Sequence, residues 1–161
     1  MNDVERTPAG MALTDAILDL FRLNSRLAAA GDRLVGGLGL TTARWQVLGA
    51  IVYSDRPQPV AWLARDLGGN RQNVQRIVND LSNEGLVAFA PNPHHRRAQL
   101  VVLTDKGKRA FDEAMRLQAP WVNGLVDGLA VEDIETTRKT IRTLRLRLEN
   151  GQDEENDSSI E

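Results

Sequence analysis

Hydrophobic residues recur at helical spacing along most of this chain. Between residues 11 and 34 they stand three, four or seven positions apart with charged residues between them, which predicts a long amphipathic helix. A second helix is expected from Thr41, whose side chain suits the N-cap position, and its apolar residues include Trp45 and Leu48. Two more helices are expected at 105–128, kinked by Pro120, and at 131–149.

Two shorter helices are predicted between these, on either side of Gly68 and Gly69. The first covers residues 60–67 and follows Pro59, which suits a helix start because no backbone donor is needed there. The second starts at Asn70, a good N-cap residue, and ends at Gly85. Its apolar residues share one side of the helix, at Val74, Ile77, Val78 and Leu81.

Strand-like runs occur at 86–90 and 99–103, and a polar loop with two prolines joins them, which predicts a β-hairpin with a long tip. Residues 54–59 are predicted to form a turn, because the prolines at 57 and 59 cannot both lie inside a helix. Residues 1–10 are expected to be a frayed arm, and the acidic residues 150–161 a disordered tail. The predicted fold class is mainly α with a small β-hairpin (α+β).

Composition leaves few chemical classes open. The chain has 161 residues, 42% hydrophobic and 26% charged, which is typical of a globular protein. It contains no cysteine, so disulfides, thiolate-bound zinc and thiol redox sensing are excluded. Acidic residues interrupt the N-terminal segment, so it lacks the basic-then-apolar pattern of a secretory signal peptide. No apolar run approaches the roughly 20 residues of a membrane span. We therefore expect a cytoplasmic protein without a membrane contact.

The usual residues of an enzyme active site are also missing from the sequence. His94 and His95 are adjacent in a loop, with no carboxylate or cysteine at a usual metal-ligand spacing. The sequence shows no glycine-rich phosphate loop, nucleophile elbow or paired-carboxylate motif. We expect a protein that is not an enzyme and that holds no cofactor and no metal ion.

Positive charge is concentrated in the middle of the chain. The formal net charge is −2, but residues 149–161 hold six acids and no base, and residues 1–148 carry +4. Residues 70–110 contain seven basic and three acidic residues. Because local potential rather than net charge selects a partner, we expect this segment to bind an anionic partner.

The helix that starts at Asn70 has the side chains of a surface that contacts DNA bases. Opposite its apolar side it carries amides and an arginine, which can hydrogen-bond base edges in the major groove. The alternative is that these amides only solvate a surface helix. The hairpin tip favours DNA, because an A/T-rich minor groove attracts inserted arginine. The predicted DNA-binding residues are Arg71, Gln72, Asn73, Gln75, Arg76, Asn79, His95, Arg96 and Arg97.

Residues 59–107 are thus predicted to form a winged helix-turn-helix, and the chain resembles the multiple-antibiotic-resistance-regulator (MarR) family. The matching residues are 60–67, 70–78, 81–87 and 96–107, and the last stretch, RRAQLVVLTDKG, is the most specific match. The resemblance follows the order of elements from residue 11 to 149. It implies an obligate homodimer with interleaved first and last helices, and a ligand crevice between the dimerisation and DNA-binding parts.

The expected organisation has three parts. Residues 11–36 and 105–149 form N- and C-terminal dimerisation helices, residues 41–104 form the winged helix-turn-helix region, and 150–161 the tail. The expected protein is a sequence-specific transcriptional regulator, a repressor that binds an inverted-repeat operator in double-stranded DNA and is released by a small-molecule effector. Arg44 and Trp45 lie where the family places its ligand, although surface charge and core packing are their alternative roles.

Two alternatives concern the function and the wing. A winged-helix module that binds protein instead of DNA would need exposed apolar anchors on the polar helix face. The family usually has an acid two positions before the second wing arginine, Arg97, and this chain has His95 there. In the family that acid is thought to steady the arginine. His95 predicts either a looser, pH-sensitive wing or a solvated loop histidine without a role.

Overall fold

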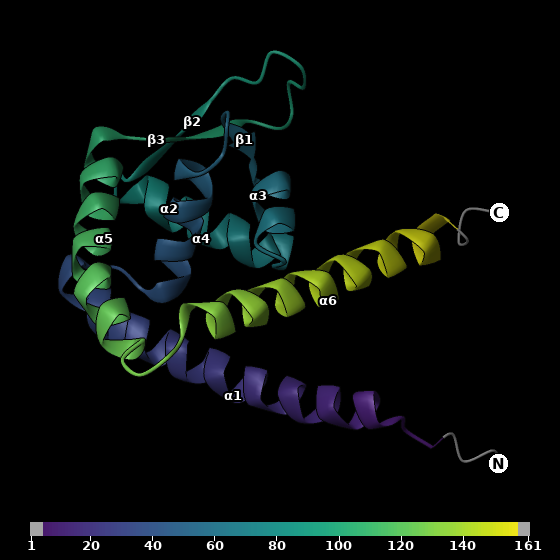
Figure 1. Ribbon diagram of the computed structural model, residues 1–161. Coiled ribbons are helices and arrows are strands. Elements are labelled where there is room, and N and C mark those ends of the chain that lie inside the picture. The colour runs from purple at the N-terminus through teal and green to yellow at the C-terminus, as the bar shows by residue number, and fades with distance from the viewer. Residues whose placement is uncertain (1–4, 158–161) are drawn as a thin grey trace. The chain divides into compact units, whose positions relative to one another are not determined.

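The computed structural model describes residues 5–157 and is mainly helical with a small antiparallel sheet (Figure 1). The predicted fold class is confirmed. The chain divides into two compact units, one ending at Ala119 and one starting at Pro120. The elements in order are α1 (Pro8–Val35), the 3₁₀ turn η1 (Gly36–Leu38), α2 (Thr42–Val52), β1 (Gln58–Pro59), α3 (Val60–Asp66), α4 (Arg71–Asn83), β2 (Val87–Ala90), β3 (Leu100–Leu103), α5 (Asp105–Leu125) and α6 (Val131–Asp157).

The core of the first unit is shared by α2, α3, α4, the sheet and the first half of α5. Leu48, Leu63, Leu81 and Val101 are among its least exposed side chains, and Phe111 of α5 packs with them. The four apolar residues predicted to share one side of α4 are all buried in this core. Complete burial of each such side chain stabilises the fold by about 1.5–3 kcal/mol. This packing fixes which side of α4 faces outward.

The sheet has the strand order β1-β3-β2, with β3 in the centre. β2 pairs antiparallel with β3 from Val87 opposite Leu103 to Ala90 opposite Leu100, as the predicted hairpin requires. β1 was expected to be part of a turn, and that prediction is wrong for residues 58 and 59, which pair with β3. A strand of two residues has no alternation to detect, and Pro59 is tolerated because it lies at the sheet edge.

Helices α1 and α2 meet at Gly31, where a side chain would not fit. A Cβ on Gly31 would lie 2.4 Å from the hydroxyl oxygen of Thr42. That hydroxyl donates to the Ala28 carbonyl at 2.8 Å, and the Thr42 N–H donates to Asp32 Oδ1 at 2.7 Å. The backbone hydrogen bond from Thr42 lowers the pKa of Asp32 below its ordinary value. Asp32 thus stabilises the N-terminal end of α2 when it is ionised.

Several helix ends differ from the predicted ones. α1 starts at Pro8 instead of residue 11, because Thr7 caps it by accepting a hydrogen bond from Gly10 N–H at 3.1 Å. α5 ends at Leu125, and the structure continues α6 to Asp157, past the predicted end at residue 149. Gly151 alone does not stop a helix whose neighbouring residues include good helix formers. Of the predicted tail, residues 158–161 lie outside the described residues.

The second unit contains the end of α5 and α6. Within its described residues, 120–151, no side chain is buried. Ile134, Ile141 and Leu148, which are spaced by seven along α6, are exposed. None of the helices in residues 5–157 combines the length and apolar character that a membrane crossing needs.

Candidate nucleic-acid interface

The turn between α3 and α4 is set by Gly68 and Asn70. Gly68 has φ +62°, which glycine adopts without strain, and it follows the end of α3. Asn70 caps α4, because its side chain accepts from the backbone N–H groups of Gln72 at 2.8 Å and Asn73 at 3.3 Å. Gly85, with φ +73°, follows the other end of α4. These predicted helix boundaries are confirmed, and they produce the helix-turn-helix pair.

The outward side of α4 is organised by hydrogen bonds between its own side chains. Gln75 Nε2 donates to Asn79 Oδ1 at 3.0 Å, one helical turn away. Arg76 donates to Asn73 Oδ1 at 3.0 Å, and its other terminal nitrogen lies 3.6 Å from Asp80 Oδ2. Pairs of this kind contribute only about 0.2–0.5 kcal/mol each to helix stability. Their main effect is to orient the side chains, which lowers the entropic cost of contacting a partner.

The loop between β2 and β3, the wing, is closed by Asn92. Its Nδ2 donates to the Ala98 carbonyl at 2.8 Å, and its Oδ1 accepts from the His94 backbone N–H at 3.0 Å. The sequence analysis did not single out Asn92. The available signal was an asparagine between two prolines, because asparagine side chains bond the backbone two residues ahead and form turns.

The wing tip carries His95, Arg96 and Arg97, and all three side chains are exposed. No ion pair in the described part of the chain includes either arginine. The acid that the family usually has at the position of His95 is therefore not replaced by another carboxylate on these arginines. Both guanidinium groups remain available to a negatively charged partner.

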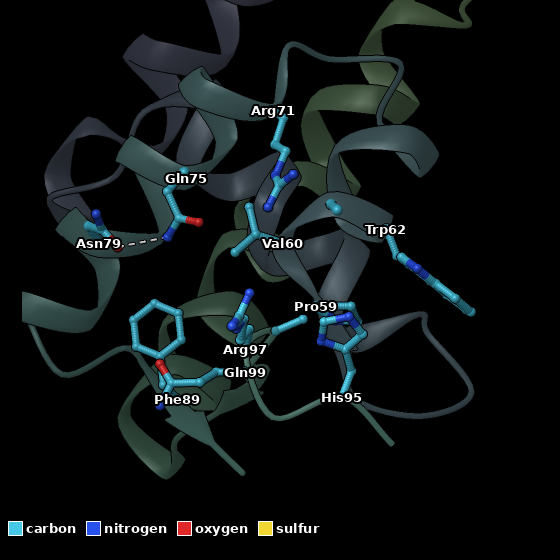
Figure 2. A pocket seen from close by; sticks show the side chains of 12 residues that line it. Pro59, Val60, Trp62, Arg71, Gln75, Asn79, Phe89, His95, Arg97 and Gln99 are labelled. Atoms are coloured by element: carbon cyan, nitrogen blue, oxygen red, sulfur yellow. Dashed lines mark hydrogen bonds between the residues drawn. The ribbon is translucent and has the colours of Figure 1, made fainter. Parts of the chain in front are cut away.

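A hollow of about 530 Å³ lies between α4 and the wing (Figure 2). Figure 2 shows Arg71 of α4 and Arg97 of the wing pointing toward the space between the two elements. The polar and charged residues that line the hollow from these two elements are Arg71, Gln75, Asn79, His95, Arg97 and Gln99. We call this space the α4–wing hollow. In it, the outward side of α4 and the wing, both predicted to contact DNA, lie next to each other.

The hollow divides the predicted DNA-binding residues into two groups. Its lining includes the five predicted residues Arg71, Gln75, Asn79, His95 and Arg97. The other four, Gln72, Asn73, Arg76 and Arg96, are exposed but lie outside the lining. Phe89, Gln99 and Trp62 also line the hollow and were not among the predicted residues. Gln99 was assigned to a strand, whereas β3 starts at Leu100 and leaves Gln99 on the loop.

The C-terminal end of α4 is held by contacts from α2 and α5. Glu84 forms an ion pair with Arg44 of α2, and its backbone carbonyl accepts from Lys106 Nζ at 2.7 Å. The Thr104 hydroxyl donates to the Gly85 carbonyl at 2.7 Å and accepts from the Gly107 N–H at 3.0 Å, so Thr104 caps α5. These contacts fix the position of α4 relative to the wing.

The two residues predicted as ligand contacts, Arg44 and Trp45, do not line the α4–wing hollow. Arg44 pairs with Glu84 and donates to the Gly39 carbonyl at 2.9 Å, and only 16% of its side chain is exposed. Trp45 is half-buried against the core. In this structure both side chains hold elements of the first unit together. A ligand-binding role for them stays a prediction.

A family profile and two curated proteins are similar to this chain over many of these elements. A sequence profile of the MarR family matches residues 38–98. The uncharacterized protein Rv2011c of Mycobacterium tuberculosis is 36% identical over 132 residues, which cover 82% of this chain and 91% of that protein. The transcriptional activatory protein BadR of Rhodopseudomonas palustris is 35% identical over 98 residues, which cover 58% of this chain and 54% of BadR.

A similar solved structure is that of Sco5413, a MarR family transcriptional regulator from Streptomyces coelicolor. It superimposes with a TM-score of 0.73 at 27% sequence identity, and the match covers 88% of this chain and 98% of Sco5413. The similarity therefore extends well beyond the segment from α3 to the wing.

Proposed function

The chain belongs to the MarR family of winged helix-turn-helix transcriptional regulators, and on that premise we propose that it binds an inverted-repeat DNA operator as a homodimer. The observation that carries the proposal is the α4–wing hollow. Gln75 and Asn79 have the amide groups that hydrogen-bond adenine edges in the major groove. Arg71, at the start of α4, supplies charge for a phosphate, and Arg97 for the adjoining minor groove.

The outward side of α4 favours DNA over a protein partner. Along Arg71–Asn83, every large hydrophobic side chain is buried, and the exposed side chains are polar or charged. A protein interface needs apolar or aromatic anchors near its centre. A surface of amides and arginine without such anchors matches a DNA groove better.

Exposed apolar side chains on both terminal helices support the homodimer. On α1 they are Met11, Ile17, Leu18, Phe21, Leu23 and Leu27. In the second unit they include Leu125, Val126, Leu129, Val131, Ile134, Ile141, Leu146 and Leu148. Clusters of this size on a surface mark association sites. Two subunits would present two α4 helices to half-sites about 34 Å apart, or one DNA turn. A monomeric mass in light scattering at micromolar concentration would contradict this part of the proposal.

Repression and release by a small-molecule effector complete the proposal. A hollow of about 520 Å³ beside α2 and α3, lined by residues that include Gln46, Tyr53 and Asp66, has the size of a small-ligand site. An effector releases DNA only if it binds the DNA-incompetent dimer more tightly than the DNA-bound form. The relative BadR is named an activatory protein. Whether this chain represses or activates a gene depends on the position of its operator relative to the promoter. A reporter gene behind the selected operator measures that direction.

The test is selection of bound sequences from random duplex, followed by fluorescence anisotropy over a range of salt concentrations. We expect an inverted repeat and an affinity that falls steeply with salt, because phosphate contacts release counterions. Gln75→Ala should relax the preference at one base pair in each half-site, while Asn123→Ala, which removes an exposed amide side chain from a residue of α5 that lines neither hollow, should not. Absence of binding to any duplex at low salt would contradict the proposal.

A further inference from the structure

Trp62 differs from the other large hydrophobic residues of the segment that runs from α3 through the wing. In residues 54–119, all of which the structure describes, it is the one large hydrophobic side chain that is exposed, at 53%. α3 is attached to the core through Val60, Leu63 and Ala64, so the indole is not needed for that packing. A single exposed hydrophobic residue is ordinary on a protein surface. Whether the exposed Trp62 has a function depends on the residues around it.

Arg56 lies against this indole. The guanidinium carbon is 5.9 Å from the centre of the Trp62 ring, within the range of a cation–π contact. Arg56 is exposed, and no ion pair within residues 5–157 includes it. The ring therefore contacts an arginine without neutralising its charge.

Trp62 and Arg56 line a second hollow of about 630 Å³, which we call the Arg56–Trp62 hollow. It adjoins the α4–wing hollow, because both are lined by Pro59, Trp62, His95 and Ala98. Figure 2 shows Trp62 on the opposite side of the α4–wing hollow from Asn79 and Phe89. A strand of DNA that passes the wing base could therefore contact both hollows in succession.

Building on the proposed function, we propose that Arg56 and Trp62 form an additional DNA contact that binds the sugar–phosphate backbone next to the wing. The guanidinium group would pair with a phosphate, and the indole N–H would donate a second hydrogen bond to the backbone. The apolar face of the ring would pack against a deoxyribose, since tryptophan combines an apolar body with one polar donor. The contact carries no base specificity and extends the operator footprint outward.

Charge and continuity favour DNA over other occupants of the Arg56–Trp62 hollow. Its lining contains Arg56, His94 and His95 and no acidic residue. The acids nearest in sequence, Asp55 and Asp66, do not line it. An uncharged aromatic effector or an apolar segment of a protein would contact the ring but would form no ion pair with the arginine beside it.

The experiment compares two duplexes that carry the same selected operator. The short duplex ends at the outermost base pair protected by the wing, and the long one continues for one helical turn on each side. The wild-type protein should bind the long duplex about tenfold more tightly, from one added charged contact in each subunit. Arg56→Gln should remove that difference and reduce the salt slope on the long duplex by about 1.8, or about 0.9 for each of two phosphates.

Two further variants test the contribution of the indole N–H and the effect of net charge alone. Trp62→Phe keeps an aromatic ring and loses the N–H, and it should remove part of the long-duplex advantage. Arg116→Gln removes the same charge as Arg56→Gln from a residue of α5 that lines neither hollow, and it should leave the ratio of affinities unchanged. Circular dichroism and the urea midpoint show that each variant is folded.

The outcomes distinguish this inference from the proposed function. If the wild-type protein binds the operator but Arg56→Gln and Trp62→Phe bind both duplexes as it does, the additional contact does not exist and the operator-binding proposal stands. The same conclusion follows if these variants change only the response to an effector or the binding of another protein. If the wild-type protein binds no duplex at low salt, the proposed function itself fails.

Discussion

Gly107 lies in the first turn of α5, where the helix passes the chain that leaves α4. A Cβ at this position would lie 1.9 Å from the Leu86 carbonyl oxygen, 2.9 Å from the Leu86 carbonyl carbon and 3.0 Å from Leu103 Cδ1. The Leu86 carbonyl accepts from the Thr104 backbone N–H at 3.2 Å, and the Thr104 hydroxyl lies 3.0 Å from it. Gly107→Ala must therefore push the start of α5 away from the base of the wing.

The size of the effect follows from this geometry. The carbonyl and the new methyl group must separate by about 1.1 Å to reach 3.0 Å, below which real Cβ contacts are essentially unknown. Overpacking of this kind costs about 1–3 kcal/mol, and each hydrogen bond lost in the shift costs about 1 kcal/mol. We expect Gly107→Ala to lower the free energy of unfolding by about 2–4 kcal/mol. That is a large fraction of the about 5–15 kcal/mol by which domains are stable.

The assay is urea unfolding followed by circular dichroism at one fixed protein concentration, because dissociation of a dimer would contribute to the midpoint. Gly124→Ala is the matched control in the same helix, since a Cβ there meets nothing within 4 Å. We expect that variant to be unchanged or more stable by up to about 1 kcal/mol. If Gly107→Ala lowers the free energy of unfolding by less than about 1 kcal/mol, the backbone at Gly107 and Leu86 can move apart easily, and the reasoning is refuted.

Three other predictions concern the wing, the contacts of α4 and the α1–α2 junction. Asn92→Ala should weaken operator binding and raise hydrogen exchange in residues 91–99, because it removes both side-chain hydrogen bonds that close the wing; unchanged exchange would contradict that role. Arg76→Ala should relax sequence preference by about 1–3 kcal/mol at one base pair, whereas Arg97→Ala should weaken binding at the wing; equal losses for Arg76→Ala on specific and random DNA would exclude base contact. The pKa of Asp32 is lowered in the folded chain, so its contribution to stability is present above the pKa of the unfolded chain and is lost as the pH falls through the folded value. Urea midpoints of the wild type and Asp32→Asn should therefore differ at pH 7 and converge below about pH 4, and a difference that persists at pH 2 would contradict this linkage.

Local signals in the sequence were sufficient for most helix boundaries. Asn70 caps α4 and Gly85 follows its end as predicted, because cap hydrogen bonds and positive φ involve residues only a few positions apart. The polar side of α4 was predictable for a similar reason. The core contains Val74, Ile77, Val78 and Leu81. Helical geometry then places Gln75 and Asn79 outside this buried side of α4 or at its edge.

The sequence could not supply contacts between distant segments. The pairing of β1 with β3 joins residues 58 and 59 to residues 100 and 101, and the Arg56–Trp62 contact places a loop arginine over a helix residue. Neither has a periodic signature. The ion pair of Arg44 with Glu84 is another example, because a residue predicted as a ligand contact holds the end of α4 instead.

The sequence by itself determined the order of the helices and of the two hairpin strands, the buried and outward sides of α4, and the concentration of positive charge in residues 70–110. These follow from periodicity, capping and composition, which act over a few residues. Only the tertiary structure decided that Arg71 and Arg97 face one hollow, that Gly107 admits no side chain, and that Trp62 remains exposed beside Arg56. Those facts depend on how the wing and α3 pack around a shared core, and that packing is set by the whole set of buried side chains.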